Sequence, residues 1–329
     1  MRIALDAMGG DQAPSVPVLG ALEALSMIEG DFEIVLVGDS EAVGRELKGK
    51  EYPKDRLTIV PASQVIGMGE PPVESVRRKR DSSIVRAVEL QKRGEADALI
   101  CAGSTGAVVA ASILMLGALP GVDRPAIGAL LPTAEDHPTL MLDAGANLEC
   151  KPRQLVQFAH LGHIYAQDLQ GRASPRIGLL NIGEEREKGG EVVVETYALL
   201  ERSGLNFHGN VEGRDIIMGN WDVVVCDGFV GNVLLKFYES VAGFIARLVS
   251  RTLADSPTDL NLENVLRILD YTEYGGAPLL GVDGVTIICH GSTPPRAVRN
   301  AVGVAIKSVE SQMVAHLKRE LSGLAGPGT

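Results

Sequence analysis

The sequence is poor in aromatic residues and in cysteine. Phenylalanine, tryptophan and tyrosine make up 4% of its 329 residues, whereas glycine occurs 38 times. This composition is typical of a soluble globular protein with many tight turns, and it fits neither a disordered chain nor a fibrous repeat. The cysteines show neither CxxC spacing nor the Cys/His spacing of a metal site, so we expect reduced, packed thiols in a cytoplasmic protein. They are Cys101, Cys150, Cys226 and Cys289.

Positive charge is also scarce, because 31 basic residues face 42 acidic ones and the formal net charge is -11. The field of the whole molecule would repel nucleic acid and anionic membrane surfaces, so nucleic acid is not an expected partner. One local exception is SVRRKRDSS at 75–83, which contains Arg77, Arg78, Lys79 and Arg80. A charge run of this kind is usually a solvated surface, but it can also dock a small acidic protein or an anionic substrate tail.

We expect no signal peptide, because MRIALDAMGGD places acids where an apolar segment would be needed. The uncharged stretch at 98–119 is long enough to span a membrane, but GSTG at 103–106 divides it. We predict a buried strand, a turn and a buried helix there. The sequence also lacks a Walker A loop, a nicotinamide fingerprint, a GxSxG elbow and HExxH, so it supports neither a serine-hydrolase triad nor a metal site.

Short apolar runs alternate with helix-like stretches along the whole chain. Most of these runs are continuous, as expected of strands that are covered on both faces. We predict an α/β fold, a three-layer α/β/α sandwich with a largely parallel sheet. A single catalytic domain over 1–322, in which two subregions can share one sheet, would be followed by a flexible tail at 323–329. A helical segment at about 244–274, with an apolar stripe typical of a core or dimer interface, would protrude.

Several predicted strands end in a polar or glycine-containing cluster. In open parallel sheets the ligand crevice lies outside the carboxyl ends of the strands, so we expect these clusters to converge on one site. CAGSTGAVVA places Ser104 and Thr105 between a strand and a helix, where backbone N–H groups can hold an anion. CDGFVGNVLLK repeats this layout with Gly231 and with Asn232 at an expected helix start. Either turn alone is also explained by tight-turn geometry, but together they favour a phosphate-sized ligand.

Two further clusters carry groups that can act on an acyl carbon. NIGEEREKGG presents Asn181 and Lys188, and a lysine at a crevice can pair with phosphate or, if desolvated, attack as an amine. A solvated loop is the simpler interpretation. CHGSTPPRAVRNA offers His290 and Ser292 before a helix. Arginines in the first turns of that helix oppose its dipole and suggest another partner; they are Arg296 and Arg299.

These stretches together resemble the bacterial phosphate acyltransferases, or acyl-[acyl-carrier-protein]:phosphate transacylases, of phospholipid synthesis. The resemblance covers essentially the whole chain. The motifs that carry it are DAMGGDQAP, SVRRKRDSSI, AGSTGA, NIGEE with Lys188, GNWDVVVCDGFVGNVLLK, GGAPLLGVDG and HGS. Two departures are mild: Arg80 stands where lysine is common, and Thr293 stands where serine is common.

The resemblance implies a homodimer with a fold similar to phosphotransacetylases and isocitrate/isopropylmalate dehydrogenases. It implies that acyl phosphate is made reversibly from long-chain acyl-carrier protein and inorganic phosphate, with no metal or organic cofactor. The product would go to a membrane glycerol-3-phosphate acyltransferase, and some family members associate peripherally with the membrane.

On this basis we expect three groups of site residues. Phosphate would be bound by Ser104, Thr105, Gly231, Asn232 and Ser292. Oxyanion stabilisation or charge pairing would come from Asn181, Lys188 and His290. Carrier-protein docking would involve Arg77, Arg78, Lys79 and Arg80, with Arg296 and Arg299 as a second patch. The rival hypotheses are an acyl-CoA:phosphate transferase of the phosphotransacetylase type, a noncatalytic lipid or phosphate sensor, and, least favoured, a metal-dependent dehydrogenase.

Overall fold

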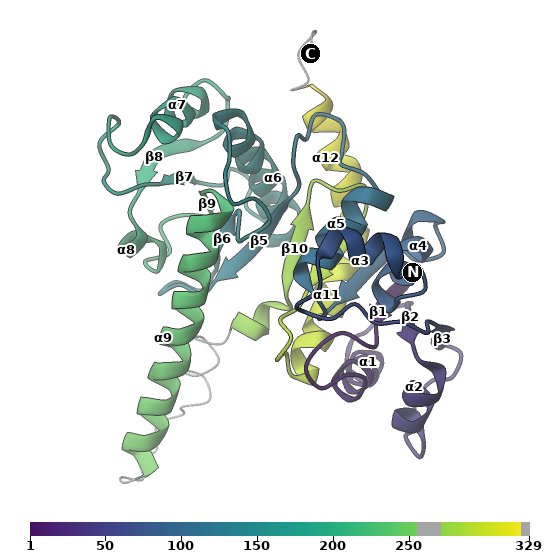
Figure 1. The fold of residues 1–329 in the computed structure, drawn as a ribbon. Coiled ribbons are helices and arrows are strands. Elements are labelled where there is room, and N and C mark those ends of the chain that lie inside the picture. The colour runs from purple at the N-terminus through teal and green to yellow at the C-terminus, as the bar shows by residue number, and fades with distance from the viewer. Residues whose placement is uncertain (255–270, 324–329) are drawn as a thin grey trace. The chain divides into compact units, whose positions relative to one another are not determined.

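The computed structural model describes residues 1–254 and 271–323 (Figure 1). They fall into two compact units. Unit 1 comprises Met1–Pro125 and Tyr274–Thr329, and unit 2 comprises Ala126–Glu273.

Unit 1 is built on a mostly parallel sheet with the strand order β3-β2-β1-β4-β11-β10. Only the pair β10–β11 is antiparallel among these pairings. Most residues of the central strands are buried, because helices cover both faces and these strands are mostly apolar. The strands are β1 (Arg2–Asp6), β2 (Glu33–Gly38), β3 (Leu57–Pro61), β4 (Ala98–Cys101), β10 (Ala277–Leu280) and β11 (Val285–Ile288).

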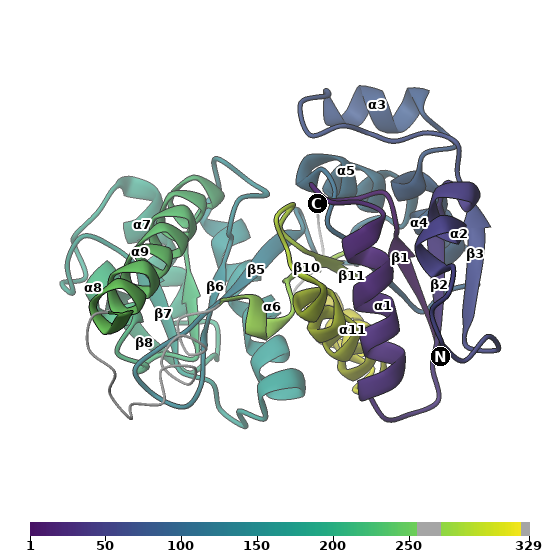
Figure 2. The ribbon, with the colours of Figure 1, turned by 90° about the horizontal axis from the view of Figure 1, so that it is seen from below.

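The helices of unit 1 pack closely on this sheet. Helices α1 (Ser15–Met27) and α11 (Pro295–Glu310) lie side by side (Figure 2). Their buried faces form one core with Ile3 and Leu5, which share a face of β1 because side chains alternate along a strand. The other helices are α2 (Ser40–Leu47), α3 (Pro72–Arg78), α4 (Ser83–Lys92), α5 (Thr105–Met115) and α12 (Met313–Ser322).

The strands of unit 2 have the order β5-β6-β9-β7-β8. The pair β5–β6 is antiparallel and the other pairs are parallel. Helix α6 contacts β6 and β9 and packs against α7, while α9 contacts β5 and β6. The strands are β5 (Ala126–Leu131), β6 (Thr139–Leu142), β7 (Ile177–Leu180), β8 (Phe207–Val211) and β9 (Val223–Val225). The helices are α6 (Pro152–Gln170), α7 (Glu191–Leu200), α8 (Gly213–Ile216) and α9 (Gly228–Ala254), followed by the 3-10 turn η1 (Tyr271–Tyr274).

The predicted α/β fold with a largely parallel sheet is confirmed. The uncharged stretch at 98–119 forms β4 and α5, as predicted. Five elements were not predicted, namely α2, α3, α8, β8 and β10. The last helix-like stretch of the sequence, at 295–320, forms two helices, α11 and α12, which are divided near Gln312 with a φ of 55°. Of the segment predicted at 244–274, residues 255–270 lie outside the described part, as do residues 324–329 of the predicted tail.

Helix α9 differs from the other described helices in its exposure. Its first part, Gly228–Val249, is long and apolar enough to cross a membrane by length and composition, and few of its residues are buried. Among the described helices it alone meets that test.

A buried aspartate at the carboxyl end of one strand in each unit holds the loop behind that strand: Asp6 ends β1, and Asp143 follows β6. In unit 1, Asp6 Oδ1 accepts a hydrogen bond from the Met8 N–H at 3.0 Å, and Oδ2 accepts one from the Cys101 thiol at 2.9 Å. Burial raises the pKa of Asp6, although these hydrogen bonds act in the opposite direction. The loop after β1 is thereby fixed to the end of β4.

Asp143 performs the same task in unit 2. Its Oδ1 accepts from the N–H groups of Ile127 at 2.9 Å and Ala146 at 3.1 Å. Its Oδ2 accepts from the backbone N–H and side-chain amide of Asn147, at 2.7 and 2.9 Å. Burial raises the pKa of Asp143, and these donors oppose that effect.

Glycines let the next elements approach both anchored loops. A Cβ on Gly9 would lie 2.6 Å from the Gly103 nitrogen, and a Cβ on Gly231 would lie 1.9 Å from the Asp143 carbonyl oxygen. No side chain fits either place. Gly231 therefore has a packing role in which α9 rests on the loop that Asp143 holds.

Removal of the Asp143 carboxylate should destabilise the protein. Asp143→Ala leaves several buried donors without an acceptor, and one such group costs about 1–3 kcal/mol. We expect the free energy of unfolding, measured by urea denaturation, to fall by about 2–4 kcal/mol. The control Asp136→Ala removes an exposed carboxylate nearby and should change it by less than about 0.5 kcal/mol. Equal effects of the two substitutions would show that Asp143 does not hold the loop.

Candidate functional site

Three adjacent parallel strands of unit 1, β1, β4 and β11, end at the same edge of its sheet. Their following loops touch one another there. The Asp11 N–H donates to the Gly291 carbonyl at 2.8 Å, and Gly9 packs against Gly103. This edge therefore gathers the predicted residues of unit 1, which are Ser104, Thr105, His290 and Ser292.

The two hydroxyls at the start of α5 have different environments. Ser104 is the N-cap, is 5% exposed, and its oxygen accepts a hydrogen bond from the Ala107 N–H at 3.4 Å. Thr105 is the first residue of the helix and is exposed. An anion at this helix start can reach the Thr105 hydroxyl, whereas the Ser104 oxygen already serves the helix.

His290 and Ser292 form a local pair. The Ser292 N–H donates to His290 Nδ1 at 3.3 Å, and the Ser292 hydroxyl lies 2.8 Å from the same nitrogen. Because Nδ1 accepts the backbone hydrogen bond, the neutral imidazole carries its proton on Nε2. The ring is exposed, so this Nε2–H is available to an anion.

Three strands of unit 2, β6, β9 and β7, likewise end side by side. Asn181 directly follows β7, and its side-chain amide is already engaged. Nδ2 donates to the Lys188 carbonyl at 2.9 Å, and Oδ1 accepts from the Ile182 N–H at 2.8 Å. Asn181 therefore fixes the loop that carries Lys188. The Lys188 side chain is exposed, and its ammonium forms no ion pair with any described residue.

The prediction that Asn232 stands at a helix start is wrong. Helix α9 begins earlier, at Gly228, because the Asp227 carboxylate accepts from the Val230 N–H at 2.8 Å and caps it. Asn232 lies in the second turn, exposed and next to Gly145. The glycines of this motif allow α9 to pack closely on Asp143, in addition to forming a turn.

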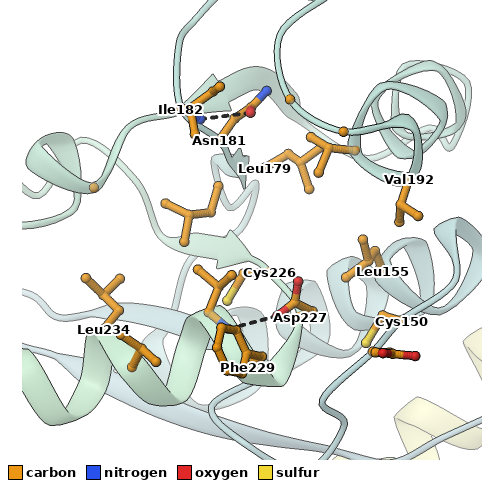
Figure 3. A pocket seen from close by; sticks show the side chains of 18 of the residues that line it. Cys150, Leu155, Leu179, Asn181, Ile182, Val192, Cys226, Asp227, Phe229 and Leu234 are labelled. Carbon is orange, nitrogen blue, oxygen red and sulfur yellow. Dashed lines mark hydrogen bonds between the residues drawn. The ribbon is translucent and has the colours of Figure 1, made fainter.

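Unit 2 also contains a pocket of about 860 Å³ that the sequence did not predict (Figure 3). It is mostly apolar and opens at the carboxyl ends of β7 and β9, beside the first turns of α9. In Figure 3, Asn181 and Ile182 lie on one side and Asp227 and Phe229 on the other. Its lining comes from five separate segments, so no local pattern could reveal it.

The basic segment at 75–83 is partly neutralised within unit 1. The Lys79 ammonium lies 2.6 Å from Glu70 Oε1 and donates to the Val65 carbonyl at 2.7 Å. The hydrogen bond from the Lys79 ammonium to the Glu70 carboxylate is the main reason why the pKa of Glu70 falls to about 2. Arg78 lies 3.7 Å from Glu74. Arg77 and Arg80 are exposed and form no ion pair among the described residues, so they are the available charges.

The second predicted patch, on α11, also differs between its two arginines. Arg299 is half-buried against α1, where its guanidinium lies 3.3 Å from the Met27 sulfur and 3.9 Å from Glu23. Arg296 is exposed. Arg299 therefore helps to hold α11 on α1.

The three buried cysteine thiols are poor nucleophiles. Burial raises the pKa values of Cys101 and Cys226 well above the usual value, and that of Cys289 to about 12. All four cysteines are free. Within the described ranges, no three His, Cys, Asp or Glu side chains come together in a way that could hold a metal ion.

The fold is shared with solved acyl transferases of low sequence similarity. Over 95% of this chain, the structure resembles the EutD phosphotransacetylase from Staphylococcus aureus, with a TM-score of 0.62, 15% identity and 94% of that chain covered. A phosphotransacetylase from Streptococcus pyogenes gives a TM-score of 0.61 at 18% identity, with the same coverage of both chains. A 4-hydroxythreonine-4-phosphate dehydrogenase from Klebsiella pneumoniae gives 0.51 at 13% identity, over 97% of this chain and 99% of that chain. These likenesses confirm the expected phosphotransacetylase-like fold.

Sequence comparison is more specific. Residues 1–316 match the family model FA_synthesis, described as fatty acid synthesis protein. The phosphate acyltransferase of Heliobacterium modesticaldum is 50% identical over 99% of each chain. That of Desulfitobacterium hafniense strain Y51 is 49% identical over 98% of this chain and 97% of its own. The chain therefore belongs to the phosphate acyltransferase family.

Proposed function

We propose that this chain makes acyl phosphate reversibly from long-chain acyl-[acyl-carrier protein] and inorganic phosphate, and so supplies glycerol-3-phosphate acylation in phospholipid synthesis. The observation that carries the proposal is the identity of about half of all residues, over the full chain, with phosphate acyltransferases. The phosphotransacetylase-like fold supports the same class of chemistry. This function also needs no nucleophile from the protein, in agreement with the buried thiols.

The reaction depends on alignment and charge stabilisation. A phosphate oxygen attacks the thioester carbonyl carbon, the C–O bond forms, and the carbonyl oxygen becomes an oxyanion. When that intermediate collapses, the C–S bond breaks and the carrier thiolate leaves and takes up a proton. Because the thioester is already activated, binding phosphate in line with the acyl carbon and stabilising the oxyanion provide most of the acceleration.

We assign these tasks to the groups at the two strand-end clusters. In unit 1, Thr105 and Ser292, with Ser104 behind them, bind phosphate, and the His290 Nε2–H donates to the oxyanion or to the departing thiolate. In unit 2, the exposed Asn232 side chain on α9 is the second phosphate-binding group, while Gly231 lets α9 pack on the loop that Asp143 holds. Lys188 supplies positive charge to the reacting groups from the loop that Asn181 holds.

The remaining partners are part of the same proposal. The chain would act as a homodimer in the cytoplasm, without a metal or organic cofactor, and would pass its product to a membrane glycerol-3-phosphate acyltransferase. Four free thiols support a reducing compartment. The exposed apolar residues of α9 support peripheral association with a membrane.

The direct test is to incubate the purified protein with phosphate and either palmitoyl-carrier protein or palmitoyl-CoA, and to measure acyl phosphate as hydroxamate. We expect product from the carrier-protein substrate. Product from CoA alone would move the chain to the phosphotransacetylase type. Tight binding of phosphate or acyl groups with no product from either donor would favour the noncatalytic sensor.

Lys188→Ala should reduce turnover. Loss of one charge that stabilises the transition state typically lowers kcat about 10²-fold or more. Steady-state kinetics with saturating phosphate and carrier substrate will measure this effect, with the exposed Lys54→Ala as the matched control. If Lys188→Ala retains full turnover, the lysine has no essential role. If an acyl group can be trapped on Lys188, the lysine acts instead as a transient acyl acceptor.

We propose that Arg77 and Arg80 dock the carrier protein, because both are exposed and form no ion pair among the described residues. We expect the double substitution R77E/R80E to raise the KM for the acidic carrier protein by about tenfold at low salt, and the effect to shrink as salt screens the charges. The control K50E/K54E makes the same change of net charge at other exposed lysines of unit 1. If both variants raise KM equally, the basic segment is an ordinary solvated surface.

A further inference from the structure

The apolar pocket of unit 2 has a buried floor and an exposed rim. Its floor includes Leu155, Leu179 and Cys226, all at most 5% exposed. Its rim consists of large apolar side chains that are open to solvent, including Ile182 at 81%, Phe237 at 66% and Phe229 at 61% exposure. Contiguous apolar surface of this kind is costly in water and typically marks a binding site.

The polar groups of this pocket lie beside the predicted reaction groups. The polar side chains of the lining are Asn181, Asp227 and Glu149, and most of the other lining side chains are aliphatic or aromatic. Gly189 and Gly190 also line it, and they directly follow Lys188 in the loop that Asn181 holds. One part of the pocket is therefore next to Lys188, while most of the remaining lining offers apolar contacts.

We propose that this pocket binds the hydrocarbon chain of the acyl substrate. The proposal rests on the proposed function, which requires a long aliphatic group to leave water while its carbonyl carbon stays near Lys188. The volume of about 860 Å³ lies within the range of roughly 300–1,000 Å³ that is typical of ligand pockets. A slender chain can reach the buried floor at Leu155 and Leu179, whereas a flat helix face of a second copy would cover only the rim.

Burial of methylene groups makes this assignment quantitative. Each methylene moved from water into an apolar site contributes about a fourfold gain in affinity. The kcat/KM of the wild-type protein should rise by about this factor per methylene until the pocket is full. Short acyl donors, which do not reach the rim, should gain nothing from it.

Helix α9 offers a matched pair of phenylalanines for the test. Phe237 lines the pocket and is 66% exposed, whereas Phe244 lies two turns further along, is 59% exposed and does not line it. Phe237→Ala should lower kcat/KM for palmitoyl-carrier protein by about tenfold or more and leave butyryl-carrier protein nearly unchanged. Phe244→Ala should change neither. Val233→Trp narrows the pocket and should shift the preference toward shorter chains.

Direct binding separates this proposal from the proposed function. Palmitate binding to each variant is measured by calorimetry, and we expect Phe237→Ala, but not Phe244→Ala, to weaken it. If no donor gives acyl phosphate but palmitate binding still depends on Phe237, the proposed function fails and the pocket stands. If acyl phosphate forms but Phe237→Ala and Phe244→Ala have the same chain-length profile, the pocket assignment is overturned. Sedimentation measures self-association of the same variants. If Phe237→Ala loses self-association but keeps its chain-length profile, the acyl-chain assignment is overturned and the pocket rim binds a second copy of the chain instead.

Discussion

Two buried carboxylates hold the loops on which both clusters of candidate site residues depend. Asp6 ends β1 and Asp143 follows β6, and each accepts hydrogen bonds from backbone N–H groups of the loop behind it. In a low-dielectric interior such bonds are strong, and their loss is costly. The turn before α5 packs on the first loop through Gly9, and α9 packs on the second through Gly231. The starts of α5 and α9 take their positions from these contacts.

The sequence predicts the buried parts of this fold well, because strands that are covered on both faces read as continuous apolar runs. It misses elements whose composition gives no such signal. β8, with the sequence FHGNV, contains polar residues, and α3, with the sequence PVESVRR, is largely polar. β10 is a short strand that follows two glycines. Strand ends were also predictable, since small and polar residues follow each apolar run.

The candidate site was predictable in its residue types but not in their contacts. Asn181 and Lys79 are residue types that often bind ligands. In the folded chain, however, the Asn181 amide donates to the Lys188 carbonyl and the Lys79 ammonium donates to Glu70. The apolar pocket depends on segments far apart in the sequence, among them Leu155, Leu179 and Phe237. Only the folded chain brings such residues together.

In the proposed reaction the chain positions its substrates, and phosphate provides the nucleophile. The buried cysteines have raised pKa values and are poor nucleophiles. The most direct test is rapid mixing with palmitoyl-carrier protein in the absence of phosphate, followed by measurement of released carrier thiol. The account predicts no rapid release until phosphate is added. A burst of one thiol per chain without phosphate would show a covalent acyl-enzyme and contradict it.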